Sequence, residues 1–500
     1  MRPVPIRLLQ HRYERLSPQD ASFLVFEKPN LPMHVGMLAF FERRSFEGSG
    51  GDIDLEKFRA YIASRLPQAQ RCRHKLAYIP IARQPVWVAD ENFDLANHVR
   101  EVRLAAPGDE AALAELAGQV FSAHLDRSRP LWEMWIVQGL ADADRFAVIC
   151  KVHHCMIDGI AAVDFIGALL TPEPVSEIVP SPAYTPTEAP HRFRLLVDEA
   201  ARWLRASAGL AFAARRFVFS SETRASFRER TRAVVTLLAR GIRGTSPGPL
   251  HEPASGRRHY AWVATERTGE RAVRARIGGS RDDIAVATAA GATRDYLVRR
   301  GGNPRKTRVR AMAPVSVRSR RERGRFGNRV TMLIVDLPVA EEQPIPRLEA
   351  VTAHVQQLKD DKAGLGVEVL TQIDRWAGTL AQNLSMEIAT HRHAYNLIVT
   401  NVPGPPVPLY ALESKMLAMY PLAPIFGGGH VGIAAMTYLD RVHWGVQYGG
   451  ADPAEAARIA ADVTAHFDAL VQAAAVAPPR IRVVEPAAAD DDDATLAANA

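Results

Sequence analysis

Cysteine and lysine are both scarce in this sequence. Its 500 residues include three cysteines, Cys72, Cys150 and Cys155, whose spacing fits neither a disulfide framework nor a zinc ribbon. We therefore expect a reducing, cytoplasmic setting. The 62 basic residues comprise 8 Lys and 54 Arg, a skew typical of codon bias, so the net charge of +7 does not indicate nucleic-acid binding. Nucleic acid is excluded further because the basic residues lack interleaved aromatic residues and a known reader motif.

A long apolar run is also missing. The longest candidate, residues 159–170, spans 12 residues and contains Asp164, whereas a transmembrane helix needs about 20 apolar residues. The N-terminal residues 1–17 lack the apolar stretch of a signal peptide. If the protein acts on lipid, we expect it to do so from the surface.

The length and the residue pattern predict an α/β protein of more than one domain. Six prolines gather between residues 171 and 190, and a helical pattern with 12 Arg and 4 acidic residues follows over 191–244, a local charge of +8. The predicted divisions are an N-terminal domain over 1–170, a linker and basic helical crossover over 171–250, a C-terminal domain over 251–475 and a disordered acidic tail over 476–500.

Hydrophobic periodicity and cap residues predict the individual elements. Helices are expected from Ser17 and over 55–66, 111–125, 160–170, 281–299, 348–359, 367–383 and 453–475. Strands are expected over 33–41, 132–140, 145–153, 307–317, 330–337, 396–400, 432–438 and 441–448.

The sharpest chemical feature is the segment from His153 to Gly159, which reads HHCMIDG. It follows a mostly apolar strand, so both histidines stand where a buried strand ends, a common place for catalytic groups. Adjacent side chains on a strand point to opposite faces, which argues against a shared metal ion. One imidazole suits a general base, Asp158 can hold an imidazole or pair with an Arg, and Gly159 leaves room for substrate or tight backbone passage. The structural alternative is two histidines at a strand end with a helix-capping Asp158.

This motif, with several others in order, resembles the bacterial wax ester synthase/diacylglycerol acyltransferase family. The resemblance covers residues 12–470 and includes the family's HHxxxDG motif. The further matching segments are Leu16-Ser17-Pro18-Gln19-Asp20, Pro32-Met33-His34-Val35-Gly36, Pro130-Leu131-Trp132-Glu133, Pro314-Val315-Ser316-Val317-Arg318, Gly327-Asn328-Arg329-Val330 and Asn401-Val402-Pro403-Gly404-Pro405.

The resemblance implies two chloramphenicol-acetyltransferase-like domains joined by a helical crossover, with the active-site channel between them. It implies transfer of a fatty acyl group from long-chain acyl-CoA to diacylglycerol or to a long-chain alcohol. His154 would be the base, His153 would support it, and Asp158 would be mainly structural. No metal or other cofactor is implied, because acyl-CoA is a substrate.

Other residues are candidates for substrate binding. Asn401 opens a Pro-Gly-Pro loop, where its amide either faces the channel or closes a turn. Ser316 or backbone amides can serve as oxyanion donors, whereas Pro130 and Trp132 are expected to shape or pack the channel.

The chain departs from the family pattern at two places. Asp282 and Asp283 stand where the family shows Asn-Asp, and we expect Asp283 to take part in substrate binding. A carboxylate at Asp282 accepts but cannot donate a hydrogen bond unless it is protonated. Pro249-Leu250-His251-Glu252 replaces the family's Pro-Leu-Asn-Gly.

The basic segment 191–244 is either a solvated crossover between domains or a surface that lies on anionic lipid. We expect peripheral attachment to the inner face of the membrane or to lipid inclusions. Two other functions stay open: a condensation-type ester or amide synthase that uses carrier-protein thioesters, and a non-catalytic lipid-binding or lipid-droplet protein.

Overall fold

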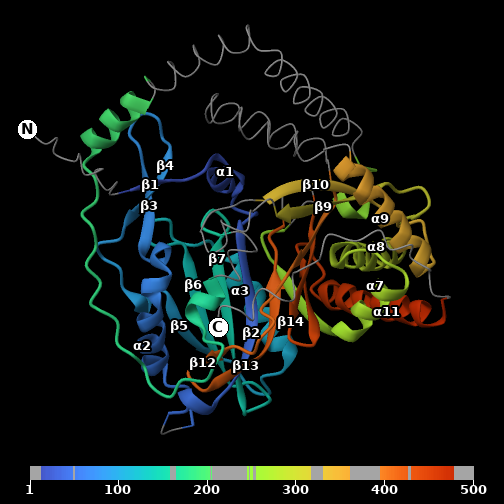
Figure 1. Ribbon diagram of the computed structural model, residues 1–500, viewed down its shortest axis with the longest axis horizontal. Helices are drawn as coiled ribbons and strands as arrows, with labels where there is room; N and C mark the ends of the chain where they lie inside the picture. The colour runs from blue at the N-terminus through green and yellow to red at the C-terminus, as the bar shows by residue number, and fades with distance from the viewer. Residues whose placement is uncertain are drawn as a thin grey trace, which may run out of the picture.

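The computed structural model describes residues 13–48, 51–157, 165–202, 204, 245–246, 248–251, 255–316, 330–360, 395–425 and 429–477. Two six-stranded sheets stand side by side, each with helices packed on it, and a third sheet of three strands lies at the edge (Figure 1).

The first sheet carries the paired histidines, in the strand order β12-β13-β2-β7-β6-β5. Its strands are β2 (His34–Glu42), β5 (Val99–Arg103), β6 (Trp132–Gln138), β7 (Arg145–His153), β12 (Tyr410–Ala411) and β13 (Ser414–Leu422). The helices of this half include α1 (Pro18–Phe26), α2 (Leu55–Arg65) and α3 (Glu110–Ser122). Only β5 and β6 are parallel within this sheet.

Strand β7 is apolar on both faces because each face is covered. Val148 and Cys150 belong to the same core as the inward residues of α2, whereas Ala147 and Ile149 pack with α3. Strand alternation therefore places His153 on the face that α3 covers.

The second sheet has the order β10-β9-β11-β14-β15-β8 and forms its own core with four helices. Its strands are β8 (His259–Glu266), β9 (Val309–Ser316), β10 (Val330–Leu337), β11 (Leu397–Val402), β14 (Val431–Tyr438) and β15 (Arg441–Tyr448). Its helices are α7 (Arg267–Arg276), α8 (Arg281–Arg299), α9 (Pro344–Asp360) and α11 (Ala454–Val476). Strand β11 runs parallel to both of its neighbours, as in α/β proteins with crossover connections.

A strand from the second half of the chain completes the first sheet. Strand β13 pairs antiparallel with β2, with Tyr420 opposite Leu38, and also contacts β14 and β15 of the second sheet. The hydroxyl of Tyr260 on β8 donates to the carbonyl oxygens of Tyr420 and Pro421, at 3.2 and 3.1 Å. The two halves are therefore joined by β13, a strand of the second half that pairs into the first sheet, and the sequence pattern did not indicate this pairing.

A second close approach joins the halves at α3. A Cβ atom on Gly118 would lie 2.3 Å from the carbonyl oxygen of Arg258, just before β8. Glycine inside this helix therefore allows the backbone of the second half to pass directly over α3.

The small sheet, β1-β4-β3, extends the first half through β1 (Glu14–Arg15), β3 (His74–Tyr78) and β4 (Pro85–Ala89). Helix α1 begins directly after β1. Its N-cap is Ser17, whose Oγ accepts the backbone N–H of Asp20 at 3.0 Å.

Among the described residues, α11 is the one helix long and apolar enough to cross a membrane. Its apolar face, including Ile459, Val463 and Phe467, is buried in the core of the second half. This packing gives α11 the position of a core helix.

The α/β class is confirmed, and the strongest local patterns are confirmed as elements. Helix α8 and strands β7, β10 and β15 have the bounds that the pattern predicts. The helix predicted over 160–170 is present at 165–169, and residue 170 is a bend. The helix predicted over 191–244 is present at 192–202 and at 204, whereas residue 191 is not helical. Residues 160–164, 203 and 205–244 lie outside the described ranges. The helix predicted over 367–383 and the tail from residue 478 also lie outside the described residues.

Candidate active site

The paired histidines are fixed through the backbone by two neighbouring segments. His153 is the last residue of β7 and stands opposite His34 in β2. Its N–H donates to the carbonyl oxygen of Leu131 at 2.9 Å, and the N–H of His154 donates to that of Met33 at 2.8 Å. Both segments are among the motifs that carry the family resemblance.

The ring of His153 is buried, with a hydrogen bond at Nδ1 and a carboxylate near Nε2. Its Nδ1 accepts the backbone N–H of Cys155 at 3.1 Å, so the proton of the neutral ring lies on Nε2. That Nε2 is 3.5 Å from Oε1 of Glu27. Burial lowers the pKa of His153, although the neighbouring carboxylate of Glu27 opposes the shift. The ring is therefore neutral near pH 7, with Nε2–H directed at Glu27.

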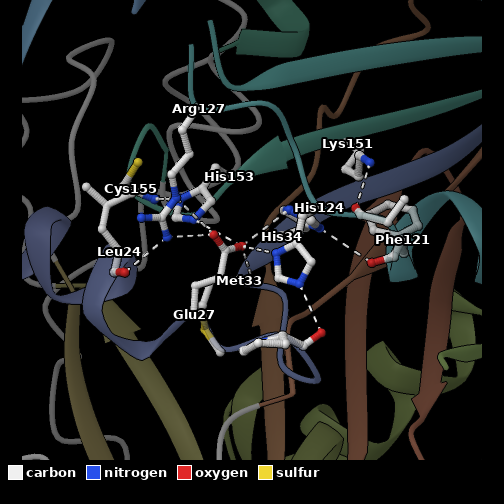
Figure 2. Close-up of polar contacts among 12 residues, drawn as sticks. Leu24, Glu27, Met33, His34, Phe121, His124, Arg127, Lys151, His153 and Cys155 are labelled. Carbon is white, nitrogen blue, oxygen red and sulfur yellow. Dashed lines mark hydrogen bonds and ion pairs between the residues drawn. The ribbon is translucent and has the colours of Figure 1, made fainter. Parts of the chain in front are cut away.

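Glu27, directly after α1, is the centre of a polar cluster that sequence reasoning missed (Figure 2). Its Oε2 accepts from Nη2 of Arg127 at 2.7 Å, and its Oε1 accepts the N–H of Met33 at 3.3 Å. Three imidazole nitrogens also face Oε1: Nδ1 of His124 at 3.2 Å, Nε2 of His153 at 3.5 Å and Nε2 of His34 at 3.6 Å. Burial alone would raise the pKa of Glu27, but the contacts with His153 and Arg127 hold that pKa far below its usual range. Glu27 is an ionised, buried carboxylate.

His154 has different surroundings from His153. It is 8% exposed, and its ring stacks on Phe23 of α1 at a centroid distance of 3.9 Å and an interplanar angle of 6°. The two adjacent rings thus contact different partners, as their alternation predicts. Within the described ranges, no group of three His, Cys, Asp or Glu side chains is arranged to hold a metal ion.

A buried lysine lies two residues before His153 on the same strand face. The Nζ of Lys151 donates to the carbonyl oxygens of Val120 and Ala123, at 2.9 and 3.1 Å, and lies 3.3 Å from Oε2 of Glu133. Burial lowers the pKa of Lys151, and the charge of Glu133 opposes this. The lysine fixes the C-terminal end of α3, the segment that leads to His124.

The predicted binding residues Pro130 and Trp132 are buried beside β7. Trp132 donates from Nε1 to the carbonyl oxygen of Cys72 at 2.8 Å and stacks on His98 at a centroid distance of 4.7 Å. These contacts make it a packing residue of the first half, and its part in substrate binding stays a prediction.

Asn401 contacts the start of α8 in the second half, the segment that contains Asp283. The Nδ2 of Asn401 donates to Oδ1 of Asp282 at 2.9 Å, so the departure from the family pattern supplies an acceptor for this amide. Asp283 forms a capping box with Ser280, with its own N–H 3.1 Å from the Ser280 Oγ. Both local roles are structural, and substrate binding by these residues stays a prediction.

Of the remaining predicted site residues, one has a known strand position and two are not described. Ser316 is the last residue of β9 and pairs with Val330 of β10. Asp158 and Gly159 lie outside the described residues.

The cluster around Glu27 was missed because its members are distant in sequence. His34 belongs to a motif that was recognised but was given no role, and Glu27, His124 and Arg127 carry no motif. Pairing of β2 with β7, together with the packing of α3, brings them together.

Fold and site together define an α/β protein in which β13 from the second half completes the first sheet and the paired histidines stand at the end of a buried strand. The sequence profile of the wax ester synthase/diacylglycerol acyltransferase catalytic domain matches residues 16–285, and that of the family's C-terminal domain matches residues 326–470. The chain therefore belongs to the wax ester synthase/diacylglycerol acyltransferase family and is an acyltransferase.

Individual relatives agree with this assignment. A putative diacylglycerol O-acyltransferase of Mycobacterium tuberculosis is 32% identical over 439 residues, which cover 85% of this chain and 83% of the relative. A probable diacylglycerol O-acyltransferase of the same species is 29% identical over 446 residues, covering 86% and 90%.

Solved structures confirm the fold. The wax ester synthase/diacylglycerol acyltransferase of Marinobacter aquaeolei VT8 matches with a TM-score of 0.64 and 23% identity, over 92% of this chain and 100% of that one. The starter condensation domain of rhizomide synthetase matches with a TM-score of 0.56 and 13% identity, over 95% and 97%. Both likenesses support the predicted pair of chloramphenicol-acetyltransferase-like halves.

Proposed function

We propose that this protein transfers a long-chain acyl group from acyl-CoA to the hydroxyl of diacylglycerol or of a long-chain alcohol, with His154 as the general base. The observation that carries the proposal is the position of His154, at the end of a buried strand in a chain of this acyltransferase family.

The reaction needs one proton transfer on each side of a tetrahedral intermediate. The imidazole of His154 takes the proton of the acceptor hydroxyl as its oxygen attacks the thioester carbonyl carbon. The carbon–sulfur bond then breaks, and the proton passes from the imidazolium to the departing sulfur, which leaves as coenzyme A thiol. The products are an ester and a free thiol.

A thioester is already activated, so positioning and a base supply most of what the reaction requires. Oxidation states do not change in this transfer, and we propose that no cofactor takes part beyond the two substrates. Ser316 and backbone amides stay candidates for donors to the oxyanion.

Diacylglycerol is the favoured acceptor because the relatives from Mycobacterium tuberculosis are named diacylglycerol O-acyltransferases. Such an acceptor resides in a membrane or a lipid inclusion, so the enzyme has to work at that surface. We propose peripheral attachment from the cytoplasmic side, supported by the local charge of +8 over residues 191–244.

The direct test measures thiol release from palmitoyl-CoA by the wild type and by His154→Ala, with dipalmitoylglycerol or hexadecanol as acceptor. Products are separated by thin-layer chromatography. We expect His154→Ala to lower turnover by about 10²–10⁴ because the general base is lost. His191→Ala, at an exposed position, is the matched control and should retain activity.

Other outcomes would assign other functions. Equal turnover by a folded His154→Ala variant would remove His154 from the mechanism. Activity with acyl-carrier thioesters but not with acyl-CoA would favour a condensation-type synthase. Lipid binding without thiol release, in the wild type and the variant alike, would favour a non-catalytic lipid-binding protein.

A further inference from the structure

The two carboxylate oxygens of Glu27 contact different groups. Oε2 receives the guanidinium of Arg127, whose Nη2 also donates to the carbonyl oxygen of Leu24 at 3.1 Å. Oε1 faces the N–H of Met33 and the histidine rings, as Figure 2 shows. The side chain of Glu27 is only 6% exposed, so the carboxylate is shielded from water, whereas the side chain of Arg127 is 40% exposed.

One connection from Glu27 to His154 runs through His153. The carboxylate favours the form of His153 that carries its proton on Nε2, 3.5 Å away. Nδ1 is then left as an acceptor for the N–H of Cys155 at 3.1 Å. The turn is closed further by the N–H of Met156, which donates to the carbonyl oxygen of His153 at 2.9 Å. His154 lies inside this turn.

A second connection runs through Met33 and helix α1. The N–H of Met33 donates to Glu27, and the carbonyl oxygen of Met33 accepts the N–H of His154. Phe23, one helical turn before Glu27, stacks on the ring of His154. His154 is thus held on its backbone and on its ring by the segment that Glu27 anchors.

We propose that Glu27 is the positioning residue of this active site: it selects the Nε2–H form of His153 and thereby fixes the turn that presents His154 to the acceptor hydroxyl. The inference rests on the proposed function of His154 as base. The negative charge is required because a carboxylate can accept from Arg127, Met33 and His153 together, whereas a glutamine at this position would direct an N–H donor at one of them.

The charged and titratable groups that face Glu27 determine the expected pH dependence. They come from the α1–β2 segment, the end of α3 and β7: His34, His124, Arg127, His153 and, further along the β7 face, Lys151. The carboxylate is the negative charge among them and favours the protonated form of the nearby imidazoles. Its removal should therefore move the acidic limb of the kcat/KM profile to lower pH.

The test compares Glu27→Gln, Glu27→Asp and a matched control, Glu455→Gln. Glu455 is also a buried carboxylate that pairs with arginine, but it belongs to α11. Its partners are Arg299 and Arg458, each 2.8 Å away. Per folded molecule, we expect Glu27→Gln to lower kcat by about 10–100-fold, as loss of a group that orients a reacting residue typically does. The KM for palmitoyl-CoA should change by less than about twofold. Glu27→Asp should recover part of the kcat and the wild-type acidic limb of the kcat/KM profile. Glu455→Gln should retain the wild-type kcat and the wild-type pH profile.

An activity-independent measurement accompanies the kinetics. Histidine ring ¹⁵N spectra, assigned with His153→Asn, should show the Nε2–H form of His153 in the wild type and its loss in Glu27→Gln. A wild-type kcat and limb in folded Glu27→Gln, or an unchanged His153 ring form, would overturn the inference. If the wild type releases no thiol, the proposed function fails, and the ring form still decides whether Glu27 selects it.

Discussion

At the scale of single residues, the first half buries charged groups beside one strand. On the α3 side of β7, Glu27 pairs with the more exposed Arg127, and the buried Lys151 pairs with Glu133. Buried ion pairs need further hydrogen bonds to offset the loss of hydration. Lys151 obtains them from two carbonyl oxygens at the end of α3, where the helix dipole also favours a cation.

We expect Lys151→Met to lower the free energy of unfolding by about 3 kcal/mol, because it leaves Glu133 without its buried partner and the end of α3 without a donor. Urea unfolding followed by tryptophan fluorescence measures the change. The double variant Lys151→Met/Glu133→Gln should lose less than the sum of the two single variants. Strict additivity would show that the pair does not interact.

At the scale of elements, the nine-residue helix α1 contacts one of the paired histidines and ends beside the carboxylate that faces the other. It carries Phe23, which stacks on His154, and it ends next to Glu27, which faces His153. Its start is fixed by Ser17, which accepts from the N–H of Asp20 and donates to its carboxylate at 2.7 Å.

Removal of this cap by Ser17→Ala should cost about 1 kcal/mol and also lower kcat, because α1 holds both histidines. The matched control is Asp54→Ala, which removes the N-cap of α2, a helix whose inward residues belong to the same core as Phe23. Thermal unfolding and thiol release at 25 °C separate the two effects. If both variants lose stability equally and neither loses kcat, α1 does not position the histidines.

The elements also differ in whether the local sequence pattern predicts them. Helix α8, strand β10 and the β14–β15 hairpin follow from local periodicity and caps, which act within a few residues. Strand β13 was missed because its partner, β2, lies almost 400 residues away, and pairing over that distance leaves no local pattern. For the same reason His153 and His154 were recognised from their motif, whereas Glu27 and its partners were not.

At the scale of the whole molecule, strand β13 is also where the two sheets meet. Tyr420 on β13 packs edge-on against His443 on β15, with ring centroids 4.9 Å apart, and a Cβ atom on Gly445 would lie 1.7 Å from the carbonyl oxygen of Pro421. His443 is 2% exposed. Burial, reinforced by the charge of Arg441, lowers its pKa from 6.5 to about 4.

We expect this buried imidazole to make the folded protein less stable at acidic pH. As the pH falls below 6.5, His443 becomes protonated in the unfolded chain, whereas in the folded protein it stays neutral down to about pH 4. The free energy of unfolding therefore decreases as the pH falls through this range. Between pH 7.5 and pH 5 the loss from this one group amounts to about 2 kcal/mol. We therefore expect His443→Phe, which keeps an aromatic ring against Tyr420, to lose about 2 kcal/mol less than the wild type over the same interval in urea unfolding. His191→Ala, an exposed control, should follow the wild type. Parallel pH dependence of the wild type and His443→Phe would show that His443 does not couple protonation to the contact between the sheets.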